Sequence, residues 1–177
     1  MNLIGPRVIL RPLERRDLEQ SRAWVNDPEN AALLLRVLPV SEIEQEQWFE
    51  RICTCPDRFV WALEVEGQHI GNMGLYQVNL IHRRAEVWTL IGEPAWRGQG
   101  LGRESMTLLL DYGFDGLGLH KLYLHVDQGN VIAQKMYKKL GFVVEGTLVA
   151  EYFILGRFRA TLRLRLLAPE WQKLKGR

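Results

Sequence analysis

The stretch "EPAWRGQGLGRES", residues 93–105, places glycine at every second position, at Gly98, Gly100 and Gly102. It follows a strand-like segment, 84–93, and precedes a segment, 101–114, with a helical apolar face. The first N–H groups of a helix and its positive end hold a phosphate without a metal ion. A tight strand-to-helix connection needs only one or two glycines, so the pattern predicts a phosphate-binding turn.

Two common phosphate loops do not fit this turn. A Walker loop needs Lys followed by Ser or Thr after the last glycine, whereas Arg103 and Glu104 follow Gly102. A dinucleotide fingerprint needs G-x-G-x-x-G, and Arg103 stands where its third glycine would fall. The turn is therefore interpreted as a pyrophosphate loop of another kind.

Composition indicates one globular domain over residues 1–177. The 177 residues are 47% hydrophobic and 25% charged, with a formal net charge of +2, which is too small to argue for nucleic acid. The first residues lack a secretory signal, and no apolar run reaches membrane-spanning length, so we expect a cytoplasmic protein without a membrane segment. Cys53 and Cys55 lie too close for an ordinary disulfide and lack a second ligand cluster, so no metal is expected.

Periodicity and capping signals predict the order of the elements. Ser41 with Glu44 forms a capping-box pattern, Asn130 is a candidate N-cap, and Gly67 and Gly141 mark a hairpin and a helix end. The expected helices are 14–27, 41–52, 101–114 and 131–140. The expected strands are 7–13, 58–67, 69–78, 84–93, 121–127, 142–155 and 158–167, and the last two finish the chain. This order favours an α/β fold with one mixed sheet flanked by helices.

Three segments together resemble the GNAT N-acyltransferase superfamily. "RGQGLG" (97–102) is similar to its Q/R-x-x-G-x-G/A coenzyme A loop, and "NVIAQKMYKKLGF" (130–142) to a second family segment. "VILRPLERRDLE" (8–19) resembles the opening of the Rim-type branch, which includes ribosomal-protein and spermidine N-acetyltransferases. The resemblance implies a GNAT-like acyl-CoA N-acyltransferase fold, with a mostly antiparallel, V-shaped sheet that admits acetyl-CoA.

The resemblance also implies a set of cofactor-binding residues. Backbone N–H groups of the loop, with Arg97 and Gln99, hold the pyrophosphate, and the end of the preceding strand pairs with the pantetheine amides. Asn130 caps its helix and also lies beside the thioester. Arg103 either adds a phosphate contact or is simply solvated. The expected set is Leu90, Ile91, Gly92, Arg97, Gly98, Gln99, Gly100, Leu101, Gly102, Arg103 and Asn130.

Two residues are candidate catalytic groups. An alkyl amine is mostly ammonium at neutral pH, so transfer needs a base, and Glu86 occupies a strand position where a carboxylate is unexpected unless it faces a cleft. The alternative is an exposed ion pair with Arg83 or Arg84. Tyr137 stands about two helical turns after Asn130, and by resemblance it protonates the departing thiolate. The alternative for Tyr137 is a packing role.

The acceptor remains open at this point. The resemblance assigns the acceptor groove to the first two helices, with Trp24, Asp27, Glu29, Trp48 and Phe49. The last strand carries Ala160 where relatives commonly carry Asp. It also alternates arginines with apolar residues, which indicates either a solvated or dimer-edge face or an RNA-docking face (Arg157, Arg159, Arg163 and Arg165).

We expect an acetyl-CoA-dependent N-acetyltransferase acting first on a protein N-terminal amine. The alternatives are a polyamine or aminoglycoside acceptor, and a non-catalytic CoA-binding or ribonucleoprotein module. A homodimer is a further expectation. His82, His120 and His125 have no metal-ligand spacing, and Ser41 and Ser105 lack the context of a hydrolase nucleophile.

Overall fold

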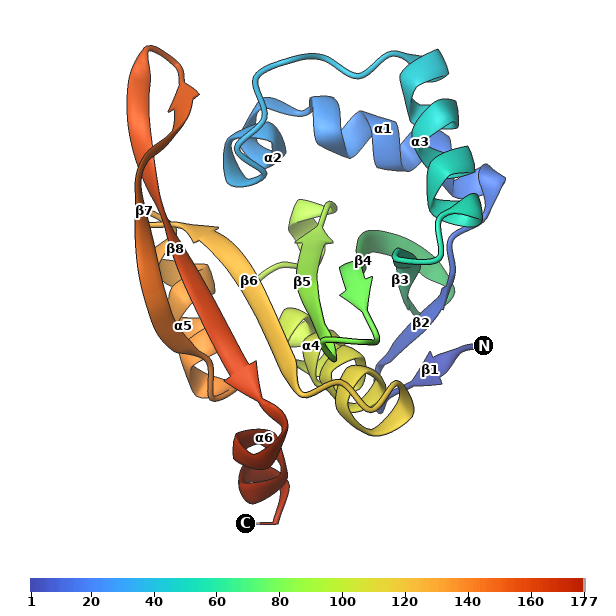
Figure 1. Cartoon of the computed structure of the whole chain (residues 1–177). Helices are drawn as coiled ribbons and strands as arrows, with labels where there is room; N and C mark the ends of the chain where they lie inside the picture. Colours follow the sequence, from blue (N-terminus) through green and yellow to red (C-terminus); the bar gives the residue numbers. More distant parts are fainter. Residues whose placement is uncertain (177) are drawn as a thin grey trace.

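A computed structural model describes residues 1–176, so the last residue of the expected 1–177 domain lies outside it. Its centre is one eight-stranded sheet with the order β1-β2-β3-β4-β5-β6-β8-β7 (Figure 1). Neighbouring strands are antiparallel except β5 and β6, which confirms a mixed, mostly antiparallel sheet. The strands are β1 Leu3–Ile4, β2 Val8–Pro12, β3 Phe59–Val65, β4 Gln68–Asn79, β5 Arg84–Ile91, β6 Lys121–Asp127, β7 Val143–Ile154 and β8 Arg157–Leu167.

The sheet opens into a fork between its two parallel strands. The registered pairs between β5 and β6 run from Arg84 with Lys121 to Glu86 with Tyr123, while β5 continues to Ile91. Figure 1 shows β6 leaning away from β5 beyond this point. The V-shaped opening expected from the family resemblance is therefore present.

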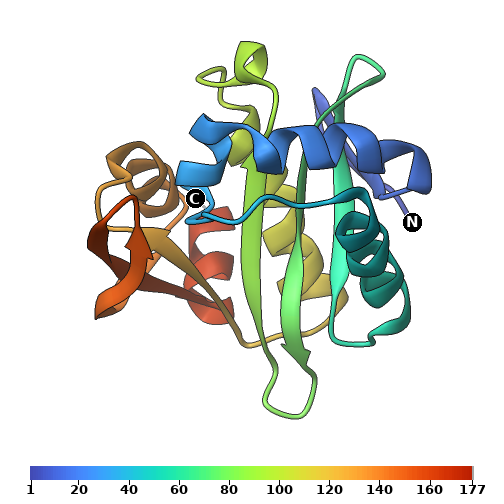
Figure 2. The same ribbon diagram turned by 90° about the horizontal axis from the view of Figure 1, so that it is seen from above.

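Helices cover both faces of the sheet (Figures 1 and 2). On one face, Leu18 of α1 and Ile52 of α3 pack on Ala62 of β3. On the other, Met106 of α4 and Leu140 beside α5 join the main core. The helices are α1 Leu18–Asn26, α2 Pro28–Leu33, α3 Glu42–Thr54, α4 Leu101–Asp111, α5 Val131–Lys139 and α6 Ala168–Lys175, with 3-10 turns at Arg15–Asp17 and Pro94–Trp96 and a π-helical turn at Tyr112–Gly116.

Three short elements were not predicted. The strand β1 is only two residues long, which is too short to show a periodic pattern. The first helix does end at Asn26, but Pro28 then opens α2, because the Asp27 side chain accepts hydrogen bonds from Glu29 and Asn30 N–H. The expectation that two strands finish the chain is wrong, since α6 follows β8 and its Glu170 carboxylate accepts a hydrogen bond from Leu167 N–H.

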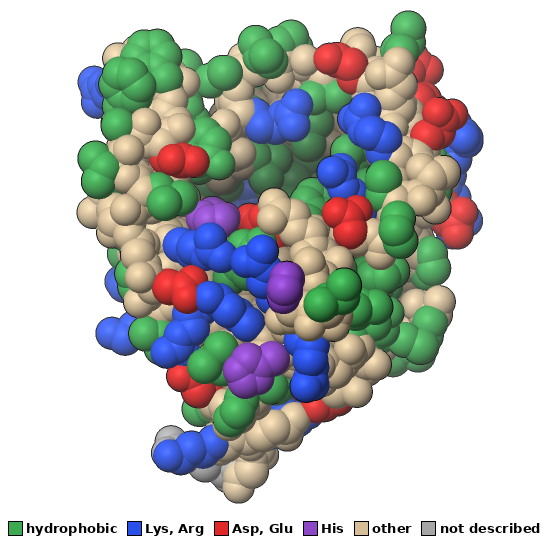
Figure 3. Space-filling view, in the orientation of Figure 1, with side chains coloured by type: hydrophobic (Ala, Val, Ile, Leu, Met, Phe, Trp, Pro, Cys, Tyr) green, Lys and Arg blue, Asp and Glu red, His purple; other side chains and the backbone are tan. Residues whose placement is uncertain are grey.

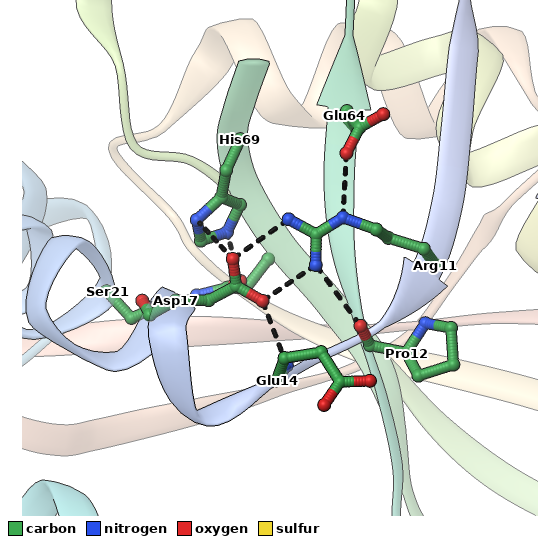
Figure 4. A network of polar contacts seen from close by, with 8 residues as sticks. Arg11, Pro12, Glu14, Asp17, Ser21, Glu64 and His69 are labelled. Carbon is green, nitrogen blue, oxygen red and sulfur yellow. Dashed lines mark hydrogen bonds and ion pairs between the residues drawn. The ribbon is translucent and has the colours of Figure 1, made fainter. Parts of the chain in front are cut away.

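A polar network ties the first helix layer to the sheet (Figure 4). The Arg11 guanidinium on β2 donates to both carboxylate oxygens of Asp17, at 2.7 and 2.8 Å, and to Glu64 on β3 at 2.7 Å. Asn72 on β4 donates to Ser21 Oγ at 2.8 Å, and Ser21 donates to the Asp17 carbonyl at 2.7 Å. Because these residues come from β2, β3, β4 and α1, the network fixes α1 over the sheet.

Candidate active site

The alternating glycines of the loop have two separate structural causes. Gly98 and Gly100 adopt left-handed backbone angles, with φ of +74° and +83°. Gly102 has another reason, because a β-carbon there would lie 3.3 Å from the Met136 sulfur of α5. The loop thus turns tightly before α4, whose first N–H groups suit a pyrophosphate.

An ion pair that the sequence did not reveal anchors this loop. Glu104 of α4 accepts hydrogen bonds from Arg7 N–H at 2.7 Å, Val8 N–H at 3.2 Å and Arg7 Nε at 2.9 Å. Arg7 Nη1 also donates to the Gln99 carbonyl at 3.2 Å. Partial burial raises the pKa of Glu104, but the bonds from Arg7 and Val8 outweigh it and lower that pKa overall. Arg7 therefore joins the first strands to the phosphate loop.

Arg97 lies against the end of β5. Its Nε donates to the Ile91 carbonyl at 3.0 Å, and its Nη2 donates to the Gly92 carbonyl at 3.1 Å and to Asn30 Oδ1. Asn30 Nδ2 also donates to the Gly92 carbonyl, at 3.2 Å. The Arg97 guanidinium thus joins the end of β5 to α2, and its contact with the phosphate stays a prediction. Pairing of Leu90, Ile91 and Gly92 with pantetheine stays a prediction.

The other residues of the predicted cofactor-binding set lie in the loop, in the first turn of α4 and at the start of α5. The Gln99 side chain donates to the Ala95 carbonyl at 2.8 Å, Leu101 is buried in the core, and Arg103 is exposed. Asn130 Oδ1 accepts from Ala133 N–H at 3.1 Å, which confirms it as the N-cap of α5. Contact of these residues with the cofactor stays a prediction.

Tyr137 lies buried in the last turn of α5. Its ring packs edge-on against Phe142, with 5.7 Å between centroids. Burial raises the pKa of Tyr137 to about 12. The hydroxyl is therefore protonated at neutral pH, as a general acid must be. The neighbouring Met136 packs against Gly102, which places this helix beside the start of α4.

Glu86 lies at the base of the fork between two tyrosines. In the strand registers, Tyr76 of β4 and Tyr123 of β6 are its neighbours on either side. His125 Nδ1 lies 2.8 Å from Glu86 Oε1. The alternative partners are not used, since Arg83 donates to the Gly118 carbonyl and Arg84 is exposed. His125 has no metal-ligand spacing in the sequence, and its place beside Glu86 depends on the pairing of β5 with β6.

Further aromatic rings surround the Glu86 carboxylate. The rings of Tyr76 and Trp88 lie 5.4 Å apart. Burial raises the pKa of Tyr76, Tyr123 and Tyr152, and the negative charge of Glu86 adds to the rise in each case. Tyr152 belongs to β7, and the charge of its neighbour Glu151 also raises its pKa. Figure 3 shows a hollow with an apolar floor between the β7–β8 hairpin and the helices α1–α3.

Comparison with known proteins identifies the family. The Acetyltransferase (GNAT) domain matches residues 7–143. The chain belongs to the GNAT acetyltransferase family. It is 40% identical over 174 residues to the spermidine N(1)-acetyltransferase of Escherichia coli K12, covering 93% of this chain and 88% of that relative. It is 34% identical over 170 residues to the Vibrio cholerae enzyme of the same name, covering 95% and 97%.

Solved structures agree with this assignment. A crystal structure of spermidine N-acetyltransferase from Vibrio cholerae in complex with CoA and spermine superposes with a TM-score of 0.89 at 33% identity, covering 94% of this chain and 98% of that one. This GNAT protein is thus an acetyl-CoA-dependent N-acetyltransferase, as expected. The match is to the superfamily and does not decide the Rim-type branch. Acetylation of a protein N-terminus, the first choice of acceptor, is not supported by these relatives.

Most of the residues that the family resemblance assigns to the acceptor groove make packing, capping or charge contacts within this chain. Trp24 is buried against Gly92, and Asp27 caps α2. Glu29 is exposed, 4.0 Å from Arg97, and the Phe49 ring lies under the Arg15 guanidinium. Trp48 differs, because its Nε1 donates to the Tyr76 hydroxyl at 3.2 Å and so connects α3 to the surroundings of Glu86.

The arginines of β8 form one face, as predicted, but acids accompany most of them. Arg159 lies 2.7 Å from Asp127 and Arg163 lies 3.1 Å from Glu145, while Arg165 pairs with Glu170. Pairing removes much of the positive charge that an RNA-docking face would need.

None of the helices in residues 1–176 is long and apolar enough to span a membrane. The same residues contain no group of three or more His, Cys, Asp or Glu side chains arranged to hold a metal ion. Ser105 is buried and donates to the Leu101 carbonyl at 2.9 Å, which agrees with its exclusion as a nucleophile.

Proposed function

We propose that this GNAT enzyme acetylates a primary amine of a polyamine such as spermidine. The observation that carries the proposal is the carboxylate of Glu86, set among tyrosines at the base of the fork. A carboxylate and aromatic faces together attract an alkylammonium ion. The names of the relatives at 40% and 34% identity point to the same acceptor class.

The same geometry supports an assignment of roles. The N-terminus of α4 and the glycine loop bind the pyrophosphate of acetyl-CoA. Glu86, together with the imidazole that it holds, removes a proton from the ammonium ion, and the neutral nitrogen attacks the thioester carbonyl. A C–N bond forms, the C–S bond breaks, and Tyr137 protonates the departing thiolate. The second proton of the attacking nitrogen then restores the Tyr137 hydroxyl, which leaves a neutral amide. The high pKa of Tyr137 keeps its proton available at neutral pH.

Thiol release from acetyl-CoA tests the proposal directly. The panel contains spermidine, spermine, a short diamine, N-terminal peptides and aminoglycosides, with an acceptor-free blank. We expect release with the polyamines well above the blank, and the acetylated product identified by mass. Release with peptides alone would restore the protein N-terminal acceptor. Binding of acetyl-CoA without release in any mixture would indicate a non-catalytic module.

We also infer that the chain associates with further copies of itself. The β7–β8 hairpin exposes Val149, Phe153, Leu155 and Phe158, and the rings of Phe153 and Phe158 lie 5.0 Å apart. A structure described as dodecameric, of spermidine N-acetyltransferase from Vibrio cholerae, superposes with a TM-score of 0.81 at 33% identity, covering 93% of this chain and 96% of that one. Light scattering should give a mass above 20.5 kDa for the native chain, and Phe153→Ser should lower it. A monomeric native chain would overturn the inference.

A further inference from the structure

The hydrogen bond between Glu86 and His125 crosses the fork at its first open position. Glu86 is in the last registered pair of β5 with β6, opposite Tyr123. His125 lies two residues further along β6, on the arm that leaves β5. Its Nδ1 nevertheless lies 2.8 Å from Glu86 Oε1, and about a quarter of each side chain is exposed (25% and 22%). The pair therefore stands where the opening begins, and both side chains are partly exposed to it.

The short contact determines where the imidazole carries its proton. An ionised carboxylate only accepts hydrogen bonds, so a nitrogen at 2.8 Å from Glu86 must carry a hydrogen. The hydrogen of neutral His125 is therefore on Nδ1. Its Nε2 then has a free lone pair and can accept a proton.

An imidazole suits this proton transfer better than a carboxylate does. The ordinary pKa of a glutamate is about 4.3, that of a histidine about 6.5 and that of an alkylammonium such as lysine about 10.4. A general base works best when its pKa lies near the operating pH. A carboxylate that fixes an imidazole through Nδ1–H, so that Nε2 acts as the base, is the arrangement of serine hydrolases.

The other charged and titratable groups around His125 do not prevent its imidazole from accepting a proton. On β6, the Tyr123 ring lies edge-on at 5.9 Å from the imidazole. On β8, Arg163 is the register partner of His125. The Arg163 guanidinium lies 4.2 Å above the Tyr123 ring and its Nε lies 3.1 Å from Glu145. The arginine opposite His125 in the register is thus paired with an acid, and the acid that faces the imidazole is Glu86.

We propose that Nε2 of His125 is the atom that receives the proton of the acceptor amine, and that Glu86 is the positioning residue that holds the ring. The assignment rests on the proposed function. The proton moves from the ammonium nitrogen to Nε2 and leaves a neutral amine and an imidazolium paired with the carboxylate. The amine then attacks the thioester, and the C–S bond breaks as Tyr137 protonates the thiolate. The second proton of the attacking nitrogen passes through solvent to the Tyr137 oxygen, and the imidazolium returns the first proton to solvent.

Two substitutions of His125 distinguish a catalytic base from a residue that only forms a hydrogen bond to Glu86. In His125→Asn, the amide nitrogen takes the place of Nδ1 and still donates to Glu86, but Nε2 is gone. We expect His125→Asn and His125→Ala to lower kcat/KM for the polyamine by about a hundredfold, with the KM for acetyl-CoA within about twofold. The limb of the pH–rate profile that belongs to the imidazole should disappear in both. His120→Asn, at an exposed histidine, is the matched control.

Near-native activity of His125→Asn with an inactive His125→Ala would overturn the proposal, because the hydrogen bond to Glu86 alone would then suffice. The ¹⁵N chemical shifts of the His125 ring provide a readout that needs no acceptor. We expect the neutral ring to carry its hydrogen on Nδ1 and none on Nε2, and the opposite tautomer would contradict the assignment. If the native chain acetylates no amine while this tautomer is found, the proposed function fails and the geometry of the pair stands.

Discussion

Trp24 of α1 lies against Gly92 at the end of β5, so closely that a β-carbon on this glycine would fall 2.0 Å from Cδ2 of the indole. Trp24 also packs edge-on against His69 of β4, with 4.7 Å between ring centroids. One indole thus connects the first helix layer to two strands. The end of β5, where the pantetheine is expected, is held by this contact.

Gly92→Ala should destabilise the protein, because the added methyl group forces the indole of Trp24 away. Overpacking of this kind costs about 1–3 kcal/mol. Urea unfolding would measure the change in the free energy of unfolding. Gly146→Ala is the control, since a β-carbon there meets nothing within 4 Å. An unchanged unfolding midpoint for Gly92→Ala would show that Trp24 moves without cost.

Glu86→Gln should lower the turnover number by more than about tenfold, because the neutral amide removes the charge that holds and stabilises the imidazole. Acetyl-CoA affinity should be nearly unchanged. Steady-state kinetics with spermidine, together with calorimetric titration of acetyl-CoA, would test both expectations. Glu19→Gln on the exposed face of α1 is the matched control. An unchanged pH–rate profile would remove Glu86 from the mechanism.

Tyr137→Phe should reduce the maximal rate while the protein stays folded, because only the hydroxyl is lost and the ring still packs on Phe142. Single-turnover measurements of CoA release would show whether the loss lies in the chemical step. Tyr112→Phe, whose ring packs on Trp61, serves as a control for the loss of a tyrosine hydroxyl. Full activity of Tyr137→Phe would make Tyr137 a packing residue.

The buried hydroxyl of Tyr137 should also make the protein sensitive to alkali. Its pKa is about 12 in the folded chain against 10.0 normally. Between these values the unfolded chain loses the proton that the folded chain keeps, so stability falls as the pH rises. The full difference is worth about 3 kcal/mol. Tyr137→Phe should therefore lose less stability than the native chain between pH 10 and 12 when urea unfolding is measured at each pH.

Asp17→Asn should be the most damaging of the changes to ion pairs. Burial raises the pKa of Asp17, but hydrogen bonds from Arg11 and the Glu14 N–H outweigh it and lower the pKa below the ordinary 3.8. The stability from this group is therefore present above that value and is lost as the pH falls through the lower folded pKa. Removal of one partner from such a buried pair costs about 3–5 kcal/mol.

The matched comparison for Asp17→Asn is Glu46→Gln, which removes the exposed pair with Arg15 and should cost less than about 1 kcal/mol. Urea midpoints at neutral pH would rank the two variants. Equal midpoints would mean that the network in Figure 4 adds little to stability.

Local signals made much of the fold predictable. The capping box of Ser41 with Glu44 is present, the Glu66–Gly67 turn joins β3 to β4, and Gly141 follows α5 with φ of +93°. Each signal depends on residues only a few positions apart. Pro28 shows the limit of such local signals. It was expected only to stop the first helix, but it also begins α2, because the Asp27 side chain caps that helix.

The contacts that shape the site could not be predicted from such local signals, because they join residues far apart in the sequence. Glu86 and His125 are 39 positions apart, and Arg7 and Glu104 are 97 apart. The period-two pattern gives the face of each strand but not the register between β5 and β6. Without that register, the histidine beside Glu86 could not be chosen from the other candidates. The contact of Arg7 with Glu104 depends instead on how α4 packs beside the first strands, which no local pattern shows. The Arg97 side chain donates to two carbonyls at the end of β5 and to Asn30, and these contacts could not be read from its place in the glycine-rich turn either.

The fork leaves the two parts of the sheet joined at β5 and β6 by three residue pairs, Arg84 with Lys121, Ala85 with Leu122 and Glu86 with Tyr123. A molecule of acetyl-CoA lying in the opening would contact both parts and supply cohesion that the polypeptide lacks there. Binding of this kind stabilises a folded chain in proportion to the logarithm of the ligand concentration. The resistance of the purified enzyme to proteolysis should then rise with the concentration of acetyl-CoA.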